Sequence, residues 1–565
     1  MMKPGHALDE VKSTISQYIQ RQNEASPKWK VSEFKFYPLK GLPSHREEIV
    51  SAVSNGAHPS GLLALGVIAL LLLLLASFNY MNVAVATVAT RLKEIGIRKV
   101  IGGRKKEIVS QFLTENFLLC TFALAIGTLL AYWVFLPGLN ALFPITVPFA
   151  FSSGNAMFFF FGALLLFIGF VSGAYPAFYI SSFSPIKILR GREKFGQRSW
   201  LSRSLLTVQF VIAFTTIVGA FVFIDNSLYL KNKDWGYDQH QAIGVPTIDN
   251  EKYLALRDRV AALKTVETFA GAESHIGYTN PRTTIDYLEQ RYQVVNYRVG
   301  FDYLETMNLR LKDGRLFDRS IQSDQIESVI INERLADKLN WEDPIGKSFD
   351  HDSTKRYVIG VVENFHYDGF YNPIEPVIFT VAPDSSLNYL VVKTQVGSTA
   401  ETDASIREIW KTVAPDDPYE GFLQNDVFAD FHRDNNSNMK LLGTISAMAV
   451  VLACLGLFGL VAFNITRRLK EFSIRKVFGA NLPHIFRLMN RDYLWILLIA
   501  FVIGAPAGFF LMNNLIQHIY PDPQTAGPVP FIMAIGLMAL TVGLTVGSQL
   551  RRVAKENPSV TLRND

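Results

Sequence analysis

Histidine is the side chain best suited to acid–base and metal chemistry near neutral pH, and His366 is the histidine with the most polar surroundings in the chain. It lies in the sequence ENFHYDGF, between Glu363 and Asp368. Such a group could hold a metal ion or move a proton. No second set of ligands follows at a suitable spacing, and His275 and His432 stand alone, so we expect neither of them to be catalytic. We interpret His366 as part of a structural loop, with a metal or acid–base site as the alternative.

The sequence motifs of nucleotide, peptide and redox chemistry are missing from the chain. No GxxxxGK[ST], HExxH, GxSxG or CxxC occurs, and no RNA- or DNA-binding motif is present. Cys120 and Cys454 both fall in apolar runs, which favours buried thiols and excludes a disulfide framework. We therefore expect no catalytic, cofactor-binding or metal-binding residues, and any ATP hydrolysis would belong to a separate protein.

The composition indicates a membrane protein that carries a soluble domain. Of the 565 residues, 49% are hydrophobic and 19% are charged. Seven apolar runs are long enough to cross a bilayer, at about 62–88, 114–136, 155–178, 204–229, 439–465, 493–514 and 528–549. Tight helix packing is predicted at Gly162, Gly169, Gly173, Gly456, Gly459, Gly504 and Gly508. Charged residues are almost absent from the runs, which favours energy from ATP over an ion gradient.

The long segment 231–436 is predicted to be a mixed α/β domain. Its strands are expected at 291–299, 328–332, 357–362, 376–381 and 389–394, and its helices at 253–263, 333–339 and 402–413. The fold class is thus an α-helical membrane protein with a mixed α/β extracytoplasmic domain.

The distribution of charge predicts the topology. The short segments 91–110, 180–203 and 467–492 are strongly basic, which places them in the cytoplasm. Segment 231–436 has 22 Lys and Arg against 34 Asp and Glu, a net charge of about −12, and is expected outside. With seven spans, the N-terminus also lies outside and the C-terminus inside.

A basic, amphipathic segment occurs twice. Residues 91–103 read RLKEIGIRKVIGG and residues 468–480 read RLKEFSIRKVFGA, so the chain contains two related halves. Each copy is predicted to be a helix with a favourable Glu–Arg pair four residues apart, which ends at Gly102 or Gly479. It could transmit force between a cytoplasmic partner and the membrane helices. The alternative is a helix that only lies among lipid headgroups.

The segment before the first span is soluble in character. Residues 8–19 have helical spacing and residues 31–39 resemble a strand, the same order that precedes the fifth span. We interpret residues 1–58 as the remnant of a first extracytoplasmic domain whose beginning and initial helix are absent. A complete protein would then have eight spans, four in each half.

Several of these motifs together resemble a known family. The repeated segments, the outer sequences FDYLETMNLRLKDGRLFD and YVIGVVENFHYDGF, and the half-ending pair SPIKILRG and NPSVTLRN resemble the permease subunits of the MacB/FtsX/LolC family of ABC transporters. The resemblance implies FtsX-like permease domains at 59–203 and 437–565, with a fourth span at 204–230. It also implies a MacB-like periplasmic core domain at 231–436, with both permease halves in one polypeptide.

The resemblance implies a cytoplasmic ABC ATPase subunit as partner, expected as a dimer, which would bind ATP and magnesium. Hydrolysis there would move the periplasmic domain, a mode called mechanotransmission. The residues expected to dock on the ATPase are Arg91, Lys93, Glu94, Ile97, Arg98, Lys99, Gly102, Arg468, Lys470, Glu471, Ile474, Arg475, Lys476 and Gly479.

The function implied by the resemblance is export or extraction of a peptide, drug, lipid or lipoprotein at a bacterial inner membrane. Membrane lipid and a periplasmic adaptor or cargo are further expected partners, and nucleic acid is not. One alternative is an ATP-driven regulator of a cell-wall enzyme or a sensor of antimicrobial peptides. A weaker alternative is a receptor without an ATPase.

Overall fold

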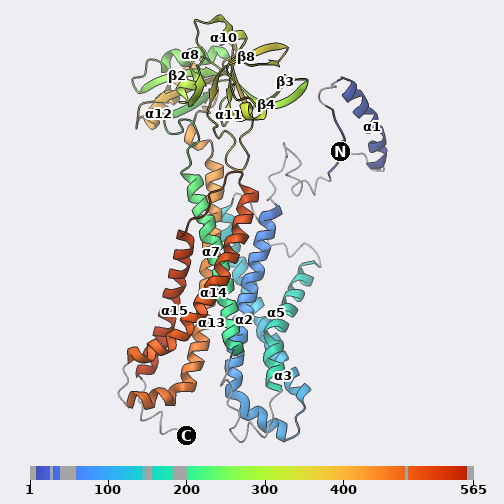
Figure 1. Ribbon diagram of the computed structural model, residues 1–565, viewed down its shortest axis with the longest axis vertical. Helices are drawn as coiled ribbons and strands as arrows, with labels where there is room; N and C mark the ends of the chain where they lie inside the picture. Colours follow the sequence, from blue (N-terminus) through green and yellow to red (C-terminus); the bar gives the residue numbers. More distant parts are fainter. Residues whose placement is uncertain are drawn as a thin grey trace. The chain divides into compact units, whose positions relative to one another are not determined.

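The computed structural model describes residues 8–25, 30–37, 59–143, 147, 156–181, 200–477 and 482–555. Its contacts divide the chain into two compact units. The membrane unit contains the long apolar helices, and the core domain is formed mainly by residues 230–433 together with Tyr520–Asp522 (Figure 1). The predicted fold class, a helical membrane protein with a mixed α/β extracytoplasmic domain, is confirmed.

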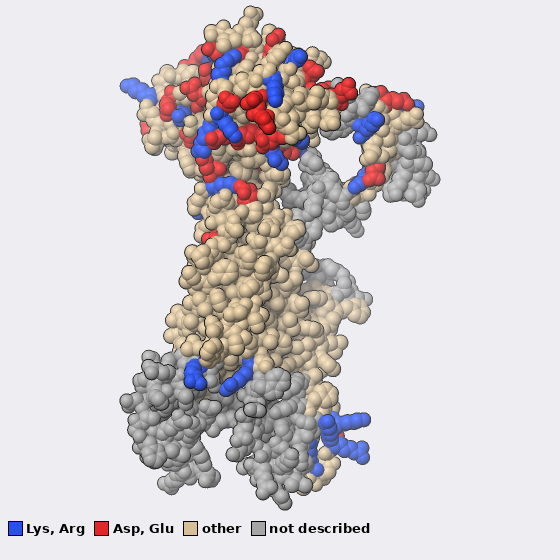
Figure 2. Space-filling view, viewed as in Figure 1, with Lys and Arg blue, Asp and Glu red and all other residues tan. Residues whose placement is uncertain are grey.

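Seven helices in the described part of the chain are long and apolar enough to cross a membrane. These stretches are Gly61–Ala84, Lys105–Leu142, Met157–Phe178, Arg203–Lys231, Ala429–Ala462, Tyr493–Ile519 and Val529–Gln549. They match the seven predicted spans. Figure 2 shows one face of these helices, whose middle part is almost free of charged side chains, as expected for a surface that contacts hydrocarbon.

The spans belong to helices that extend beyond the apolar stretches. The helices are α2 (Pro59–Val100), α3 (Lys105–Leu130), α5 (Ala156–Ser181), α7 (Trp200–Lys231), α13 (Ala429–Val477), α14 (Leu482–Ile519) and α15 (Val529–Lys555). The π-helical turn η2 (Ala131–Phe135) carries α3 into α4 (Leu136–Leu142). No proline interrupts α2 after its apolar stretch or α13 along its length, so both continue into the repeated basic segment.

Most of the predicted glycine contacts are present. A Cβ at Gly504 would lie 2.5 Å from the carbonyl oxygen of Val211 on α7, and one at Gly456 would lie 2.8 Å from Gln209 on the same helix. Glycines 169, 173, 459 and 508 are also close to a neighbouring helix. The prediction is wrong for Gly162, where nothing lies within 4 Å. Glycine therefore sets the spacing between α7, α13 and α14.

A Gly504→Val substitution should destabilise the membrane unit by about 1–3 kcal/mol, because the new side chain would have to displace the backbone of α7. The thermal unfolding midpoint of the detergent-purified chain measures this effect. Gly536→Val on α15 is the matched control, since nothing lies within 4 Å of Gly536. Equal midpoints for the two variants would contradict the packing argument.

The first part of the core domain is an antiparallel sheet in the strand order β11-β1-β10-β2. Its elements are β1 (Ala242–Pro246), α8 (Asn250–Val260), β2 (Val266–Ala272), η3 (Asp384–Ser386), β10 (Tyr389–Thr394), α12 (Thr399–Val413), β11 (Phe422–Leu423) and η4 (Gln424–Asp426). Leu256 of α8 and Trp410 of α12 pack with Ile243 and Val392 of the sheet in one apolar core. Two helices therefore cover this sheet on one face.

The second part of the core domain is a small barrel. Strands β4, β3, β7, β8, β6 and β9 pair in that order, and β9 pairs with β4 to close the ring. Its elements are β3 (Arg282–Tyr287), β4 (Gln290–Val299), α9 (Tyr303–Thr306), β5 (Leu311–Gly314), α10 (Gln322–Ile326), β6 (Ser328–Asn332), α11 (Glu333–Lys338), β7 (Ser348–His351), β8 (Thr354–Val362) and β9 (Val377–Val381). Leu335 of α11 and Trp341 pack with the apolar residues of the barrel.

The five predicted strands and three predicted helices of this domain are confirmed, with ends shifted by up to about three residues. Residues 8–19 also form the expected helix, within α1 (Leu8–Ala25). The prediction of a strand at 31–39 is wrong for its described residues, 31–37, which are in no strand. A strand needs a partner for its backbone groups, and Val31 instead bonds through its N–H (2.7 Å) and C=O (3.0 Å) to the side chain of Asn23.

Candidate functional site

The first repeated segment forms a helical hairpin with the start of the next span. Helix α2 ends at Val100, Gly102 adopts a φ of +106°, and α3 begins at Lys105. A glycine is favoured at that φ, so the predicted stop at Gly102 is confirmed. The Gly103 N–H donates to the Arg98 carbonyl at 2.9 Å and closes the turn.

Polar side chains hold the two arms of the hairpin together. Arg91 donates to Glu115 at 3.0 Å, and Arg98 donates to Gln111 at 2.8 Å. Arg98 also pairs with Glu94 at 2.8 Å, as the spacing of the repeat predicted. These groups are half-exposed, so each pair stabilises the hairpin only slightly. The two guanidinium groups nevertheless have partners inside the chain, which makes them positioning groups for the turn.

The turn end of the hairpin exposes three apolar side chains. We call Ile97, Val100 and Ile101 the hairpin tip. Their exposed fractions are 49%, 61% and 81%, whereas Ile95 on the opposite side of α2 is 3% exposed. Partial burial, followed by repulsion from Lys105, lowers the pKa of the neighbouring Lys99. An apolar patch rimmed by cations is suited to contact with another protein.

The second repeated segment lies at the end of α13, which runs to Val477. Residues Arg468, Lys470, Glu471, Ile474, Arg475 and Lys476 are all on this helix. Their side chains, the side chain of Lys93 on α2, and Gly479 lie outside the described residues. The docking role of these residues stays a prediction.

Sequence reasoning missed Gln111 and Glu115, which complete the first hairpin from α3. They are four residues apart and joined by a 3.0 Å hydrogen bond. Their spacing at the start of an apolar run could have indicated that they lie on one face of a helix. Their contacts with α2 could not be predicted in this way, because they form only when α3 folds back antiparallel to α2.

The side chains of Glu363, His366 and Asp368 do not come together at one site in the core domain. Glu363 pairs with Arg310 at 3.6 Å, and Asp368 accepts a hydrogen bond from Asn372 at 2.8 Å. His366 packs on Phe370 with ring centroids 4.7 Å apart. Burial, and then the charge of Lys233, lowers its pKa to about 4. Within the described ranges, no group of three His, Cys, Asp or Glu could hold a metal ion.

His275 connects two parts of the core domain. It is fully buried, with Nε2 at 2.7 Å from Gln424 Oε1 and Nδ1 at 2.9 Å from the Tyr303 hydroxyl. Tyr303 accepts the Ile276 N–H at 3.0 Å, so its own proton is free to point at His275. A neutral imidazole protonated at Nε2 satisfies both contacts. Burial lowers the pKa of His275 to about 4, which keeps the ring neutral.

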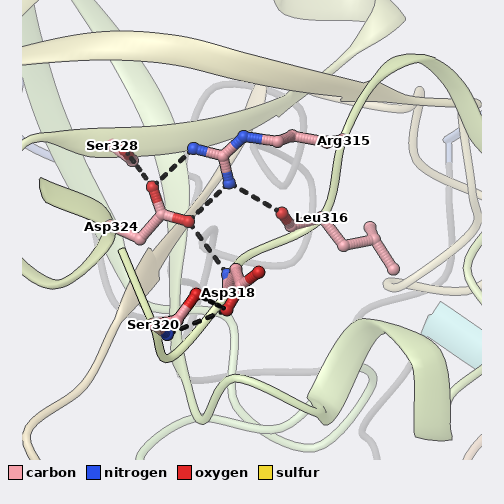
Figure 3. Close-up of polar contacts among 6 residues, drawn as sticks. All are labelled: Arg315, Leu316, Asp318, Ser320, Asp324 and Ser328. Carbon is pink, nitrogen blue, oxygen red and sulfur yellow. Dashed lines mark hydrogen bonds and ion pairs between the residues drawn. The ribbon is translucent and has the colours of Figure 1, made fainter. Parts of the chain in front are cut away.

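A buried carboxylate fixes the loop that follows β5 (Figure 3). Asp324 on α10 is fully buried and accepts two hydrogen bonds from Arg315, at 2.6 and 2.8 Å. The Asp318 N–H and the Ser328 hydroxyl donate to the same carboxylate at 2.9 and 2.7 Å. Burial alone would raise the pKa of Asp324, but these donors together lower it below its usual range.

Comparison with known families accounts for both units. The model described as "FtsX-like permease C-terminal" matches residues 66–185 and again 443–558, and the model described as "MacB-like periplasmic core domain" matches residues 206–409. Each FtsX-like match contains one copy of the repeated segment. The chain belongs to the MacB/FtsX family of ABC transporter permeases. The predicted family membership is confirmed, and the molecule is a multi-pass membrane protein.

The curated relatives include proteins named "Macrolide export ATP-binding/permease protein MacB". The one from Neisseria gonorrhoeae is 24% identical over 335 residues, which cover 56% of this chain and 49% of the relative. The one from Campylobacter jejuni is 33% identical over 125 residues, covering 22% of this chain and 18% of the relative. The chain thus spans about half, or less, of the length of these relatives.

Two solved structures are similar to part of this permease. The periplasmic region of MacB from Actinobacillus actinomycetemcomitans has a TM-score of 0.28 at 14% identity and covers 34% of this chain and 93% of that one. The extracellular domain of the transporter YknZ has a TM-score of 0.23 at 15% identity and covers 30% and 92%.

Proposed function

We propose that this permease is driven by a separate cytoplasmic ABC ATPase, which binds ATP and magnesium and docks on the hairpin tip and on its counterpart in the second half. The ATPase would change the angle or height of the docking helices, and the core domain would follow. The residues predicted from the repeat, from Arg91 to Gly102 and from Arg468 to Gly479, form this contact.

The observation that carries the proposal is the continuity of α13. This helix has 49 residues, so it is about 70 Å long at 1.5 Å per residue. Its first residues, Ala429 to Arg433, belong to the core domain, and its last turns contain the second repeated segment. A single helix therefore joins the proposed docking segment to the core domain, and it can carry displacement without a channel through the membrane.

The proposed topology rests on the distribution of charge in the sequence. The basic segments would face the cytoplasm, and the core domain and N-terminal segment would lie in the periplasm of a bacterial inner membrane. The work done there would be export or extraction of a peptide, drug, lipid or lipoprotein, for which the names of the MacB relatives give some support.

The proposal is tested by reconstituting the full chain in lipid nanodiscs with an ABC ATPase encoded in the same genome. The permease should bind the ATPase and change its rate of ATP hydrolysis at a fixed stoichiometry. Nanodiscs that contain the membrane lipid alone are the control. Each ABC ATPase encoded in the genome is tested in this way. If none of them binds the permease or changes its rate of hydrolysis, the proposal is contradicted.

The cargo is approached separately, by placing photo-reactive side chains on the core domain and turning the ATPase over. Crosslinks to a small molecule, lipid or lipoprotein that need ATP hydrolysis would support transport. Crosslinks to a cell-wall enzyme alone would count against it.

A further inference from the structure

One end of the barrel in the core domain is lined by basic and polar side chains that point inward. Residues paired across a strand ladder point to the same face of the sheet. Arg356 pairs with Phe349, and Thr283 pairs with Val294. Phe349 and Val294 belong to the apolar core of the barrel, so Arg356 and Thr283 also face its interior.

His351 and Arg298 complete this polar end. His351 is two residues from Phe349 on β7 and is 3% exposed, with Nε2 at 3.4 Å from the Thr283 hydroxyl. Arg298 lies near the end of β4 and pairs with Glu273 at 2.8 Å. The apolar part of the barrel interior packs against Leu335 and Trp341.

Buried nitrogen atoms at this end have no hydrogen-bond partner. They are Nε and Nη1 of Arg356, which are donors, and Nδ1 of His351. Nδ1 is a donor in the tautomer whose Nε2 accepts from the Thr283 hydroxyl. Arginine has no acceptor and stays charged in proteins. Arg356 is partly buried, and burial of charged donors without partners is costly, so an arginine kept there calls for a negative group.

The charges around Arg356 leave it without a full counterion. Glu273 is paired with Arg298, and Asp352 is 77% exposed and lies 3.4 Å from His351. Burial lowers the pKa of both His351 and Arg356; the charge of Asp352 opposes this effect in part, and proximity to Arg298 adds to it. The arrangement therefore repels cations and offers donors.

We propose that the polar end of the barrel binds a small oxyanion of the phosphate class, held by Arg356 and His351, with Thr283 and Arg298 at its edge. The bound oxygen atoms would accept from the donors that have no partner within the chain. The ligand would connect strands β3, β7 and β8. Strands β7 and β8 already pair along their length, but the ladder between β3 and β7 is limited to the single pair Asp286–Asp350. This site is separate from the ATPase contact and does not depend on it.

The test is the thermal unfolding midpoint of the full chain in detergent, measured with increasing inorganic phosphate at constant ionic strength set with chloride. Phosphate should raise the wild-type midpoint in a saturable way. In Arg356→Met the affinity should fall more than about tenfold, while the midpoint without phosphate stays equal or rises, because an unpaired buried charge has been removed. Arg319→Met is the matched control, since Arg319 is 59% exposed and pairs with Asp302.

Glycerol 3-phosphate is the second arm, and it distinguishes a free phosphate from a phosphorylated headgroup. If both compounds raise the midpoint, the site can also bind a phosphorylated lipid headgroup. If inorganic phosphate alone raises it, the site binds the free ion. If Arg356→Met does not fold, Arg356→Lys with isothermal titration of phosphate takes its place, and weaker binding is again expected. No phosphate effect beyond that of chloride, or an equal effect in wild type and the Arg356 variant, would overturn the proposal.

Discussion

An Asp324→Ala substitution is expected to destabilise the core domain by about 2–4 kcal/mol, because it removes a fully buried carboxylate that accepts hydrogen bonds from three residues. Asp324 is fully buried and accepts from Arg315, the Asp318 N–H and the Ser328 hydroxyl (Figure 3). The variant would leave the Asp318 N–H and the Ser328 hydroxyl without this acceptor, and Arg315 would keep only its contact with the Leu316 carbonyl. Urea unfolding of the full chain in detergent, followed by tryptophan fluorescence, gives the difference.

The matched control for this variant is Asp302→Ala. Asp302 pairs with Arg319 on the surface, and both side chains are 59% exposed, so the loss should stay below about 1 kcal/mol. Because the pKa of Asp324 is lowered, its contribution is present at neutral pH and is lost only as the pH falls through that lowered pKa. Similar unfolding free energies for the two variants at neutral pH would show that the Asp324 contacts carry no special stability.

Acid should weaken the core domain through His275 well before the carboxylates titrate. The folded protein holds this ring neutral with a pKa of about 4, whereas the unfolded chain protonates it near pH 6.5. The unfolded state therefore binds more protons between these values, and stability falls as the pH drops from about 6.5 to 4. The loss from this residue is on the order of 3 kcal/mol.

His275→Gln should remove that share of the pH dependence, although it lowers stability at neutral pH by breaking the contact with Gln424. The measurement is the unfolding free energy of wild type and variant across this pH range. His240→Gln, at an exposed position, is the control and should follow the wild type. A His275→Gln variant with the wild-type slope would contradict the assignment of the buried neutral ring.

Elements with strong local patterns were predictable from the sequence. The strands at 328–332 and 389–394 are continuous apolar runs, and they match β6 and β10. Strand β3 reads RTTIDY and β7 reads SFDH, and neither has enough apolar alternation to stand out. The barrel that they close depends on pairings between distant strands, which a local pattern does not contain.

The candidate site was predictable only in part, for the same reason. The repeat and its Glu94–Arg98 pair follow from local spacing, whereas the contacts of Arg91 and Arg98 with α3 follow from the turn at Gly102. The four donors to Asp324 converge only after the loop from Arg315 has folded back on α10. The wrong prediction of a strand at 31–39 shows the converse: the described residues, 31–37, have a strand-like pattern but no partner strand, and they form no strand.

Docking of the ATPase on the hairpin tip is tested most directly by its affinity for an Ile101→Asp permease in nanodiscs. Ile101 is 81% exposed, so the substitution should leave the fold intact. The matched control is Val396→Asp, at a core-domain position that is 89% exposed. We expect Ile101→Asp to weaken ATPase binding by about 30-fold, the effect of losing one central contact of about 2 kcal/mol, and Val396→Asp to bind as the wild type does. Unchanged affinity in the Ile101→Asp permease would contradict the docking role of the hairpin tip.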